Sequence, residues 1–267
     1  MKSKLAIKIF LSSPLKIIKR GILSQYENHF KQQVEKKYQM TQLPTIEISD
    51  LLGEIEETID NYSFLSGTSL VTDIFLLKSL AKKFDKCIYL EIGSWRGESV
   101  FNVSEVAKTC YSVTLSSEEM LSMNFDQKFI DVHGVFSKGK ENIITIGKNS
   151  QFFDFSTLNE KFDLMFIDGD HTFEGVLSDT KKVFELRRNE NSIIVWHDYG
   201  LNVEETRHSV LNAILDGIPK DKHKNLYQVS NTLCAVYIEN LELQKSHIKF
   251  PTYPNKKFSI SMKIEKL

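Results

Sequence analysis

Short apolar runs alternate with helix-like stretches through the middle of the chain. The apolar runs are residues 87–93, 110–116, 142–147, 162–168 and 192–198. Helices are predicted at residues 66–84, 98–108, 118–128, 173–188 and 204–216. Strands that are apolar throughout and separated by helices indicate a parallel sheet covered on both faces. We therefore predict a doubly wound α/β fold with a ligand crevice at the carboxyl ends of the strands.

The two ends of the chain show different patterns. Residues 225–231 and 232–239 are predicted as two further strands, close enough in sequence to pair. Apolar and polar side chains alternate over residues 257–264, which is typical of an edge strand. We predict a basic helical extension at 1–60 with a loop near Pro44, a central domain at 61–240 and a C-terminal tail at 241–267. The central sheet is predicted to be mainly parallel, with seven strands.

Charge is distributed unevenly along a chain of ordinary composition. Hydrophobic residues make up 41% of the 267 residues and charged residues 26%, which is normal for a globular protein. The formal net charge of −1 argues against a general nucleic-acid binder, so we expect no nucleic-acid partner. Residues 1–37, however, hold nine basic and two acidic residues, a net charge of +7.

The basic N-terminal segment has two interpretations. No apolar stretch reaches the roughly 18–20 residues that a membrane span needs, and residues 1–23 lack the unbroken apolar core of a signal peptide. This segment is either a peripheral anchor on an anionic membrane surface or a helix packed on the domain or on a partner subunit, as in a homodimer.

The cysteines indicate a reducing compartment. Cys87, Cys110 and Cys234 lie far apart in sequence and have no zinc-binding spacing. They are expected to be free thiols in the core of a cytoplasmic protein. Peripheral attachment at the inner face of the membrane is the alternative location.

A glycine-bearing turn, LEIGSWRGES, joins the first apolar run to a helix. Gly93 permits a tight turn, and Gly97 lets the backbone approach a ligand closely. The spacing Glu-x-Gly-x-x-x-Gly differs from the Gly-x-Gly-x-x-Gly motif that cradles a pyrophosphate. Glu91, at the end of the strand, suits a cationic ligand better than an anionic one. The turn therefore favours a cationic ligand over a dinucleotide.

Carboxylate and imidazole side chains follow the fourth and fifth apolar runs. The residues are Asp168, Asp170, His171, His197 and Asp198, in FIDGDHTFEG and IIVWHDYG. Because neighbouring parallel strands end at the same edge of a sheet, we expect them to meet in one pocket. Helix capping by Asp170 or Thr172 explains part of the pattern but not the whole cluster. Crowded carboxylates of this kind need a cation or hydrogen bonds to organise them.

These motifs resemble the class I S-adenosylmethionine-dependent methyltransferases. The motifs look most like a bacterial O-methyltransferase-like branch with FIDGDHTYEGV-type fourth strands. The resemblance covers about residues 62–240 and rests on LEIGSWRGES, FIDGDHTFEGVLSD and IIVWHDYG. It implies a Rossmann-like methyltransferase fold, S-adenosylmethionine as cofactor and methyl transfer to a hydroxyl group. A sugar of a polysaccharide or other glycan is the expected acceptor, with a small aromatic metabolite as the second candidate.

The resemblance also implies which residues bind the cofactor. The turn after the first strand would hold the methionine end, and residues after the third strand the adenine. Where relatives usually offer an acid to the ribose, this chain has Thr114, with Glu118 a turn later, and either residue could substitute. The cofactor residues implied are Glu91, Gly93, Ser94, Trp95, Gly97, Ser99, Thr114, Glu118, Asn149, Ser150, Asp168 and Gly169.

Catalysis and metal binding are assigned to the cluster after the fourth and fifth runs. Metal-dependent relatives place ligands at positions that match Asp168, His197 and Asp198. The implied ion is magnesium or manganese; a histidine ligand puts magnesium in doubt, and His197 could instead serve as general base or select a softer ion such as manganese or zinc. The general base would be His171 or His197, with Asp168 or Asp198 orienting it or holding the metal.

Three other classes of protein were weighed against this interpretation. The glycine spacing, and the lack of an acid at the end of the second strand, disfavour an NAD-dependent oxidoreductase. A non-catalytic Rossmann-like binding protein stays open because of Thr114. A nucleic-acid methyltransferase would favour Asn/Asp-Pro-Pro-Tyr where this chain has Asp-Gly-Asp-His.

Overall fold

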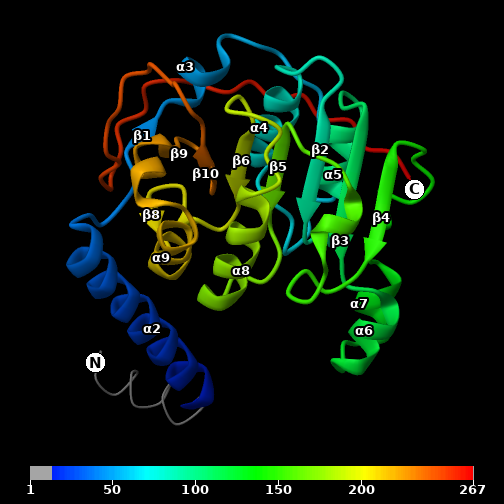
Figure 1. Ribbon diagram of the computed structural model, residues 1–267, viewed down its shortest axis with the longest axis horizontal. Helices are drawn as coiled ribbons and strands as arrows, with labels where there is room; N and C mark the ends of the chain where they lie inside the picture. Colours follow the sequence, from blue (N-terminus) through cyan, green and yellow to red (C-terminus); the bar gives the residue numbers. More distant parts are fainter. Residues whose placement is uncertain (1–13, 267) are drawn as a thin grey trace.

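The five predicted apolar runs form five neighbouring parallel strands. A computed structural model describes residues 14–266 of the protein (Figure 1). The five strands are β2 (Ile88–Ile92), β3 (Thr109–Thr114), β4 (Ile143–Gly147), β5 (Leu164–Ile167) and β6 (Ile193–Trp196). The pairs β2–β3, β3–β4, β2–β5 and β5–β6 are all parallel, as predicted.

Three further strands extend the sheet to eight, in the order β1-β9-β10-β6-β5-β2-β3-β4. The predicted pair is present as β9 (Leu226–Val229) and β10 (Ala235–Tyr237), which run antiparallel. The prediction of seven strands is wrong by one, because β1 (Thr45–Ile46) pairs with β9 from within the expected helical extension. Pro44 disfavours a helix at the residue before it, and the two β-branched residues that follow are buried at the sheet edge.

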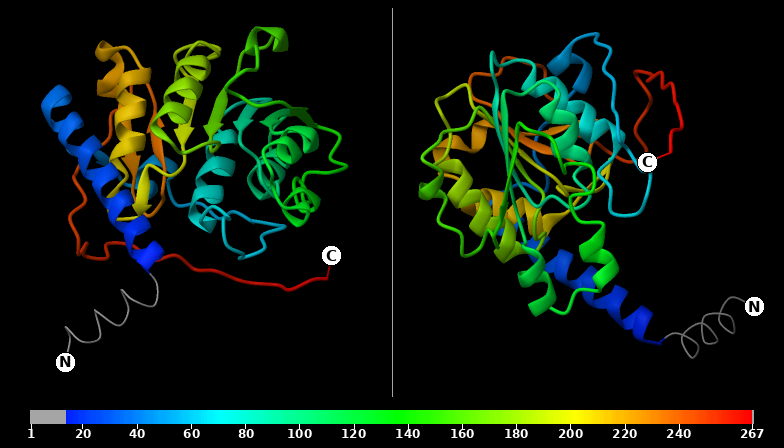
Figure 2. Two further views of the ribbon diagram at one scale, coloured as in Figure 1. Left: turned by 90° about the horizontal axis from the view of Figure 1, so that it is seen from below. Right: turned by 90° about the vertical axis from the view of Figure 1, so that its right-hand side faces the viewer.

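The predicted edge strand at 257–264 is absent, and this part of the chain lies in an irregular, exposed tail (Figure 2). Its alternating apolar side chains are 44–96% exposed. The edge beside β1 is already covered, because Thr45 and Ser246 exchange two backbone hydrogen bonds of 2.8 and 2.9 Å. Lys256 is then held by an ion pair with Glu47, so the chain is tethered before the alternating segment begins.

Helices cover both faces of the sheet (Figures 1 and 2). One face packs against α2 (Pro14–Tyr38), α8 (Phe173–Phe184) and α9 (His208–Gly217), and the other against α3 (Ile48–Leu52), α4 (Val71–Ala81) and α5 (Glu98–Ser104). Strand β2 shows the alternation that separates the two cores. Leu90 and Ile92 face the first layer, and Tyr89 faces the second.

Two predicted helices differ in detail from the structure. The predicted helix at 118–128 is two short helices, α6 (Ser117–Ser122) and α7 (Gln127–Asp131). The predicted helix at 204–216 begins only at His208, after a hairpin of β7 (Gly200–Asn202) and β8 (Glu205–Thr206). Two 3₁₀ helices, Phe155–Leu158 and Lys220–Asn225, complete the regular elements of residues 14–266.

The N-terminal helix α2 packs on the domain. Glu27 accepts hydrogen bonds from the first two backbone N–H groups of α9, which have no partner within that helix. Phe30 stacks on Phe173 of α8 with the ring centroids 4.9 Å apart, and Lys37 pairs with Asp216 at 2.8 Å. The described part of the extension therefore fits a helix packed on the domain.

The structure describes part of the N-terminal segment and all three cysteines. Residues 1–13 lie outside the described residues, as does most of the segment predicted to contact a membrane. Within the described residues, no helix has the length and apolar character of a membrane span. The three cysteines are free and buried, as the sequence predicts.

Candidate functional site

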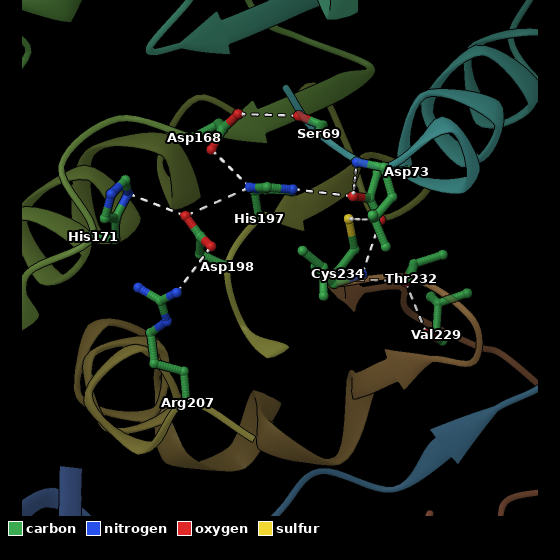
Figure 3. Close-up of polar contacts among 12 residues, drawn as sticks. Ser69, Asp73, Asp168, His171, His197, Asp198, Arg207, Val229, Thr232 and Cys234 are labelled. Carbon is green, nitrogen blue, oxygen red and sulfur yellow. Dashed lines mark hydrogen bonds and ion pairs between the residues drawn. The ribbon is translucent and has the colours of Figure 1, made fainter. Parts of the chain in front are cut away.

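The ends of β5 and β6 bring four predicted residues together (Figure 3). Nδ1 of His197 lies 2.9 Å from Oδ1 of Asp168 and 3.6 Å from Oδ2 of Asp198. Nδ1 of His171 lies 3.1 Å from the same Asp198 oxygen. The side chains meet because β5 and β6 are adjacent parallel strands, and each residue lies just beyond the carboxyl end of its strand. We call these four residues the carboxylate–imidazole cluster.

A fifth member of the site, Asp73 in α4, was missed by sequence reasoning. Its carboxylate is fully buried, and Oδ2 lies 3.1 Å from Nε2 of His197. Val195 in β6 packs against α4, and His197, two residues further, lies on the same side of the sheet. A lone aspartate in the apolar helix VTDIFLLKSLA was the available signal, but nothing in the sequence indicates which strand end it faces.

Asp198 is held as a carboxylate by its neighbours. Arg207, another residue missed from sequence, donates to Oδ1 of Asp198 at 3.1 Å. Burial alone would raise the pKa of Asp198, but contact with His197 and the positive charges of His197 and Arg207 lower it to about 2. Asp198 is therefore a stable acceptor for the histidine on either side.

The two histidines occupy different environments. His197 is nearly buried, with one carboxylate on its Nε2 side and two on its Nδ1 side. Burial acts to lower the pKa of His197, but the charge of Asp168 outweighs it and holds that pKa well above its usual value. The side chain of His171 is 56% exposed and contacts Asp198 through Nδ1 alone. Nε2 of His171 makes no hydrogen bond within the described chain.

Asp170 does not join the cluster, because it belongs to the start of α8. Its carboxylate accepts from the backbone N–H and the hydroxyl of Thr172, at 3.0 and 2.8 Å. Thr172 in turn is the N-cap residue of α8 and accepts from the N–H of Gly175 at 3.2 Å. The capping interpretation therefore accounts for both residues.

The glycine turn after β2 lies directly against the cluster. Gly93 has φ +86°, and a Cβ there would lie 2.2 Å from the backbone oxygen of Asp168. Gly97 has φ +87°, and a Cβ there would lie 2.7 Å from Oγ of Ser137. Both glycines are required by the fold. Gly97 therefore lies close to Ser137 of this chain, a contact that the sequence did not predict; the expected close approach was to a ligand.

Glu91 is a buried residue on the α5 side of the sheet. Its carboxylate accepts from the hydroxyls of Tyr89 and Ser99, at 2.7 and 2.8 Å. Burial raises the pKa of Glu91 to about 7, although these two hydrogen bonds act to lower it. Glu91 and Ser99 therefore stabilise the start of the glycine turn from the α5 side of the sheet.

Several buried polar atoms around the glycine turn have no hydrogen-bond partner in the described chain. The Thr114 hydroxyl contacts the backbone oxygen of Ser94 at 3.2 Å and Nε2 of His133 at 3.0 Å. Oγ of Ser94, Nε1 of Trp95 and Nδ1 of His133 are buried and unpartnered. Buried polar atoms are normally hydrogen-bonded, so these three are candidates for contact with a ligand.

A segment of the chain lies across this part of the turn. The backbone N–H of Gly134 donates to the oxygen of Trp95 at 2.6 Å, and that of Phe136 donates to the oxygen of Arg96 at 2.9 Å. These contacts and that of Ser137 with Gly97 place residues 134–137 over the turn. We call these four residues the covering segment.

The remaining predicted cofactor residues lie near the end of β4 and the start of α6. The backbone N–H of Asn149 donates to Glu119, and the backbone oxygen of Ser150 accepts from Lys182. Glu118 is exposed to solvent, whereas Thr114 lies at the end of β3 beside the glycine turn. Of the two candidates for the ribose position, only Thr114 contacts the turn.

The carboxylate–imidazole cluster also fits a divalent cation. One atom each from Asp168, His197 and Asp198 lie within 4.8 Å of one another. Nδ1 of His197 is buried and makes no hydrogen bond of favourable angle, despite its short distance to Asp168. With His197 neutral, Asp73, Asp168, Asp198 and Arg207 together carry a net formal charge of −2. A divalent cation would neutralise that charge, and the donor set of two oxygens and one nitrogen suits manganese or zinc.

Comparison with known proteins bears on the same part of the chain. Residues 90–199 match a family model described as "Methyltransferase domain". The match supports a methyltransferase domain over these residues, which include the glycine turn and the carboxylate–imidazole cluster. No curated protein matches the sequence.

Several solved structures resemble the fold. Cofactor-bound Rv0187 from MTB is 17% identical, covering 65% of this chain and 82% of that one, with a TM-score of 0.44. An S-adenosylmethionine-dependent methyltransferase from Clostridium acetobutylicum is 18% identical, covering 48% of this chain and 50% of that one, with a TM-score of 0.33. CalS10, an amino pentose methyltransferase from Micromonospora echinaspora bound to S-adenosylmethionine, is 11% identical, with coverages of 49% and 51% and a TM-score of 0.36.

Proposed function

We propose that this protein transfers a methyl group from S-adenosylmethionine to a hydroxyl of a sugar or another small molecule. The observation that carries the proposal is the contact between the glycine turn and the carboxylate–imidazole cluster at Gly93 and Asp168. It puts the carboxylates of the cluster beside the turn where a positively charged sulfonium would bind. The match of residues 90–199 to a methyltransferase domain supports the same reaction.

The cofactor would lie along the turn and the unpartnered polar atoms beside it. S-adenosylmethionine, when bound, supplies a methyl group on a positively charged sulfur. Asp168 would accept from its amino group, while Ser94 and Trp95 offer a hydroxyl and an indole N–H that have no partner in the described chain. Thr114 and His133 would contact the ribose, because they lie together at the end of β3 where an acidic side chain is absent.

His171 is the general base that we propose. An alcohol is a poor nucleophile at neutral pH, so a base within reach of its proton assists the transfer. Nδ1 of His171 lies 3.1 Å from Asp198, so the neutral ring would carry its hydrogen on Nδ1 and its lone pair on the exposed Nε2. Nε2 takes the acceptor's proton as the oxygen forms its bond to the methyl carbon and the carbon–sulfur bond breaks. Asp198 then stabilises the imidazolium. His197 cannot take this role, because carboxylates contact both of its ring nitrogens.

We also propose a divalent cation at Asp168, His197 and Asp198, with manganese or zinc favoured over magnesium. Such an ion, when bound, makes a nearby hydroxyl more acidic. The three side chains would orient the acceptor near Nε2 of His171, since Asp198 touches both histidines. The polar, partly exposed character of the cluster supports a hydroxylated acceptor such as a sugar over a small aromatic molecule.

Isothermal titration calorimetry with S-adenosylhomocysteine and with NAD⁺ tests this proposal. We expect S-adenosylhomocysteine to bind and NAD⁺ not to bind, because the turn lacks the closely spaced amides that hold a pyrophosphate. The reverse result would favour an oxidoreductase. No binding of either ligand would favour a binding protein that has lost the activity.

A further inference from the structure

Asp73 is surrounded by hydrogen-bond donors on both carboxylate oxygens (Figure 3). Oδ2 accepts from the backbone N–H of Leu70 at 2.8 Å and lies 3.1 Å from Nε2 of His197. Oδ1 accepts from the backbone N–H of Leu233 at 2.8 Å and lies 3.6 Å from Sγ of Cys234. Because a backbone N–H can only donate, both oxygens of Asp73 act as acceptors.

This arrangement fixes the proton on the imidazole of His197. Nε2 faces an oxygen that accepts, so Nε2 must carry the hydrogen. When the ring is neutral, the lone pair is therefore on Nδ1. That atom is buried, has no hydrogen bond of favourable angle, and faces Asp168 and Asp198. Asp73 thus determines which nitrogen the neutral ring of His197 presents to the cluster.

We propose that Asp73 is the positioning residue of the cation centre: it holds His197 as the Nε2–H tautomer so that Nδ1 is a ligand atom beside Asp168 and Asp198. The inference rests on the cation centre of the proposed function. Ligating histidines in proteins commonly donate their other N–H to a carboxylate, and this partner raises the basicity of the ligand and fixes the ring. Asp73 has no other polar neighbour in the cluster, so its effect is exerted through His197 alone.

The first test is the affinity of full-length protein for Mn²⁺ and Zn²⁺, measured by calorimetry in wild type and Asp73→Asn. We expect the substitution to weaken binding about 10–100-fold, because an amide can place a donor against Nε2 and favour the other tautomer. Asp163→Asn is the matched control. Asp163 also accepts a backbone N–H, from Ile88, but it lies at the opposite end of the strands. The affinity of the Asp163→Asn protein for the cation should equal that of wild type.

The second test reads the protonation of the His197 ring in the wild-type protein, and a variant serves only to assign its signals. ¹⁵N NMR of the wild-type histidine side chains, with His197 assigned by His197→Gln, reports which ring nitrogen carries the proton. We expect Zn²⁺ to shift Nδ1 of His197 while the hydrogen stays on Nε2. A hydrogen on Nδ1 in the zinc-bound protein, or equal cation affinity in folded Asp73→Asn and wild type, would overturn the role of Asp73 and leave the cation centre standing.

Absence of cation binding by wild type would overturn both the cation centre and the role of Asp73. Calorimetry with S-adenosylhomocysteine on the same samples separates this result from a failure of methyl transfer as a whole. If the protein binds the cofactor but no cation, only the proposed cation centre and the proposed role of Asp73 are overturned.

Discussion

The two halves of the candidate site differ in how fully their polar groups are satisfied. At the carboxylate–imidazole cluster, Asp73, Arg207 and His171 contact the buried ring of His197 and the carboxylate of Asp198. Beside the glycine turn, Ser94 and other residues have buried polar atoms without a partner, and the covering segment lies over the backbone. Under the proposed function, the cluster is the chemical half, whose groups already hold one another in place, and the turn is the binding half, whose unpartnered polar atoms the cofactor would satisfy.

The largest expected effect is on turnover, in the arranged half. His171→Ala should lower kcat about 10²–10⁴-fold, the usual contribution of a general base, while the affinity for S-adenosylhomocysteine stays within about twofold. Steady-state kinetics with calorimetry measure both quantities. His29→Ala is the control, since His29 lies on α2, outside the carboxylate–imidazole cluster, and contacts Gln33. Undiminished kcat in His171→Ala would place the base elsewhere.

A second prediction concerns the support beneath the binding half. The pKa of Glu91 is raised to about 7 in the folded protein, so folding favours its protonated form. Stability from this group is complete below the pKa of the unfolded chain, about 4.5, and is lost as the pH rises through 7. The loss amounts to about 3 kcal/mol in the free energy of unfolding.

Denaturant unfolding of wild type and Glu91→Gln at pH 5 and pH 8 measures this loss. Glu91→Gln removes the ionisation, so its free energy of unfolding should change less than that of wild type between these two pH values. Equal changes in the two proteins would show that Glu91 titrates normally in the folded state.

A third, smaller effect distinguishes the two residues at the ribose position. Thr114→Val removes the hydroxyl that joins Ser94 to His133. The affinity for S-adenosylhomocysteine should therefore fall about tenfold, which corresponds to the loss of one hydrogen bond of about 1.4 kcal/mol. Glu118→Gln, at an exposed position, should change it less than about twofold. Calorimetry on both variants decides the matter, and the opposite ranking would assign the ribose to Glu118.

The fold was largely predictable because its signals are local. Fully apolar runs such as residues 162–168 predict buried parallel strands, and strand adjacency then predicts that Asp168 and His197 meet. The tail at 257–264 has the alternation of a strand, yet it forms none, because the edge beside β1 is covered by Ser246. The alternation of apolar and polar residues alone does not show whether a sheet edge is free to pair with the segment.

The parts of the site that sequence did not predict depend on contacts between distant segments. Asp73 lies more than a hundred residues before His197, on a helix whose only sequence signal is one acid among apolar residues. His133 and the covering segment belong to a connection that has no motif, and only the three-dimensional path of the chain brings them to the glycine turn. Spacing within a motif carries no information about such partners.

The crystal structure of the complex with S-adenosylhomocysteine tests the central claim most directly. We expect the homocysteine part along Gly93–Gly97 beside Asp168, the ribose at Thr114 and His133, and the covering segment displaced from Gly97. A ligand bound elsewhere, or a turn still closed by Ser137 at saturating ligand concentration, would contradict the account.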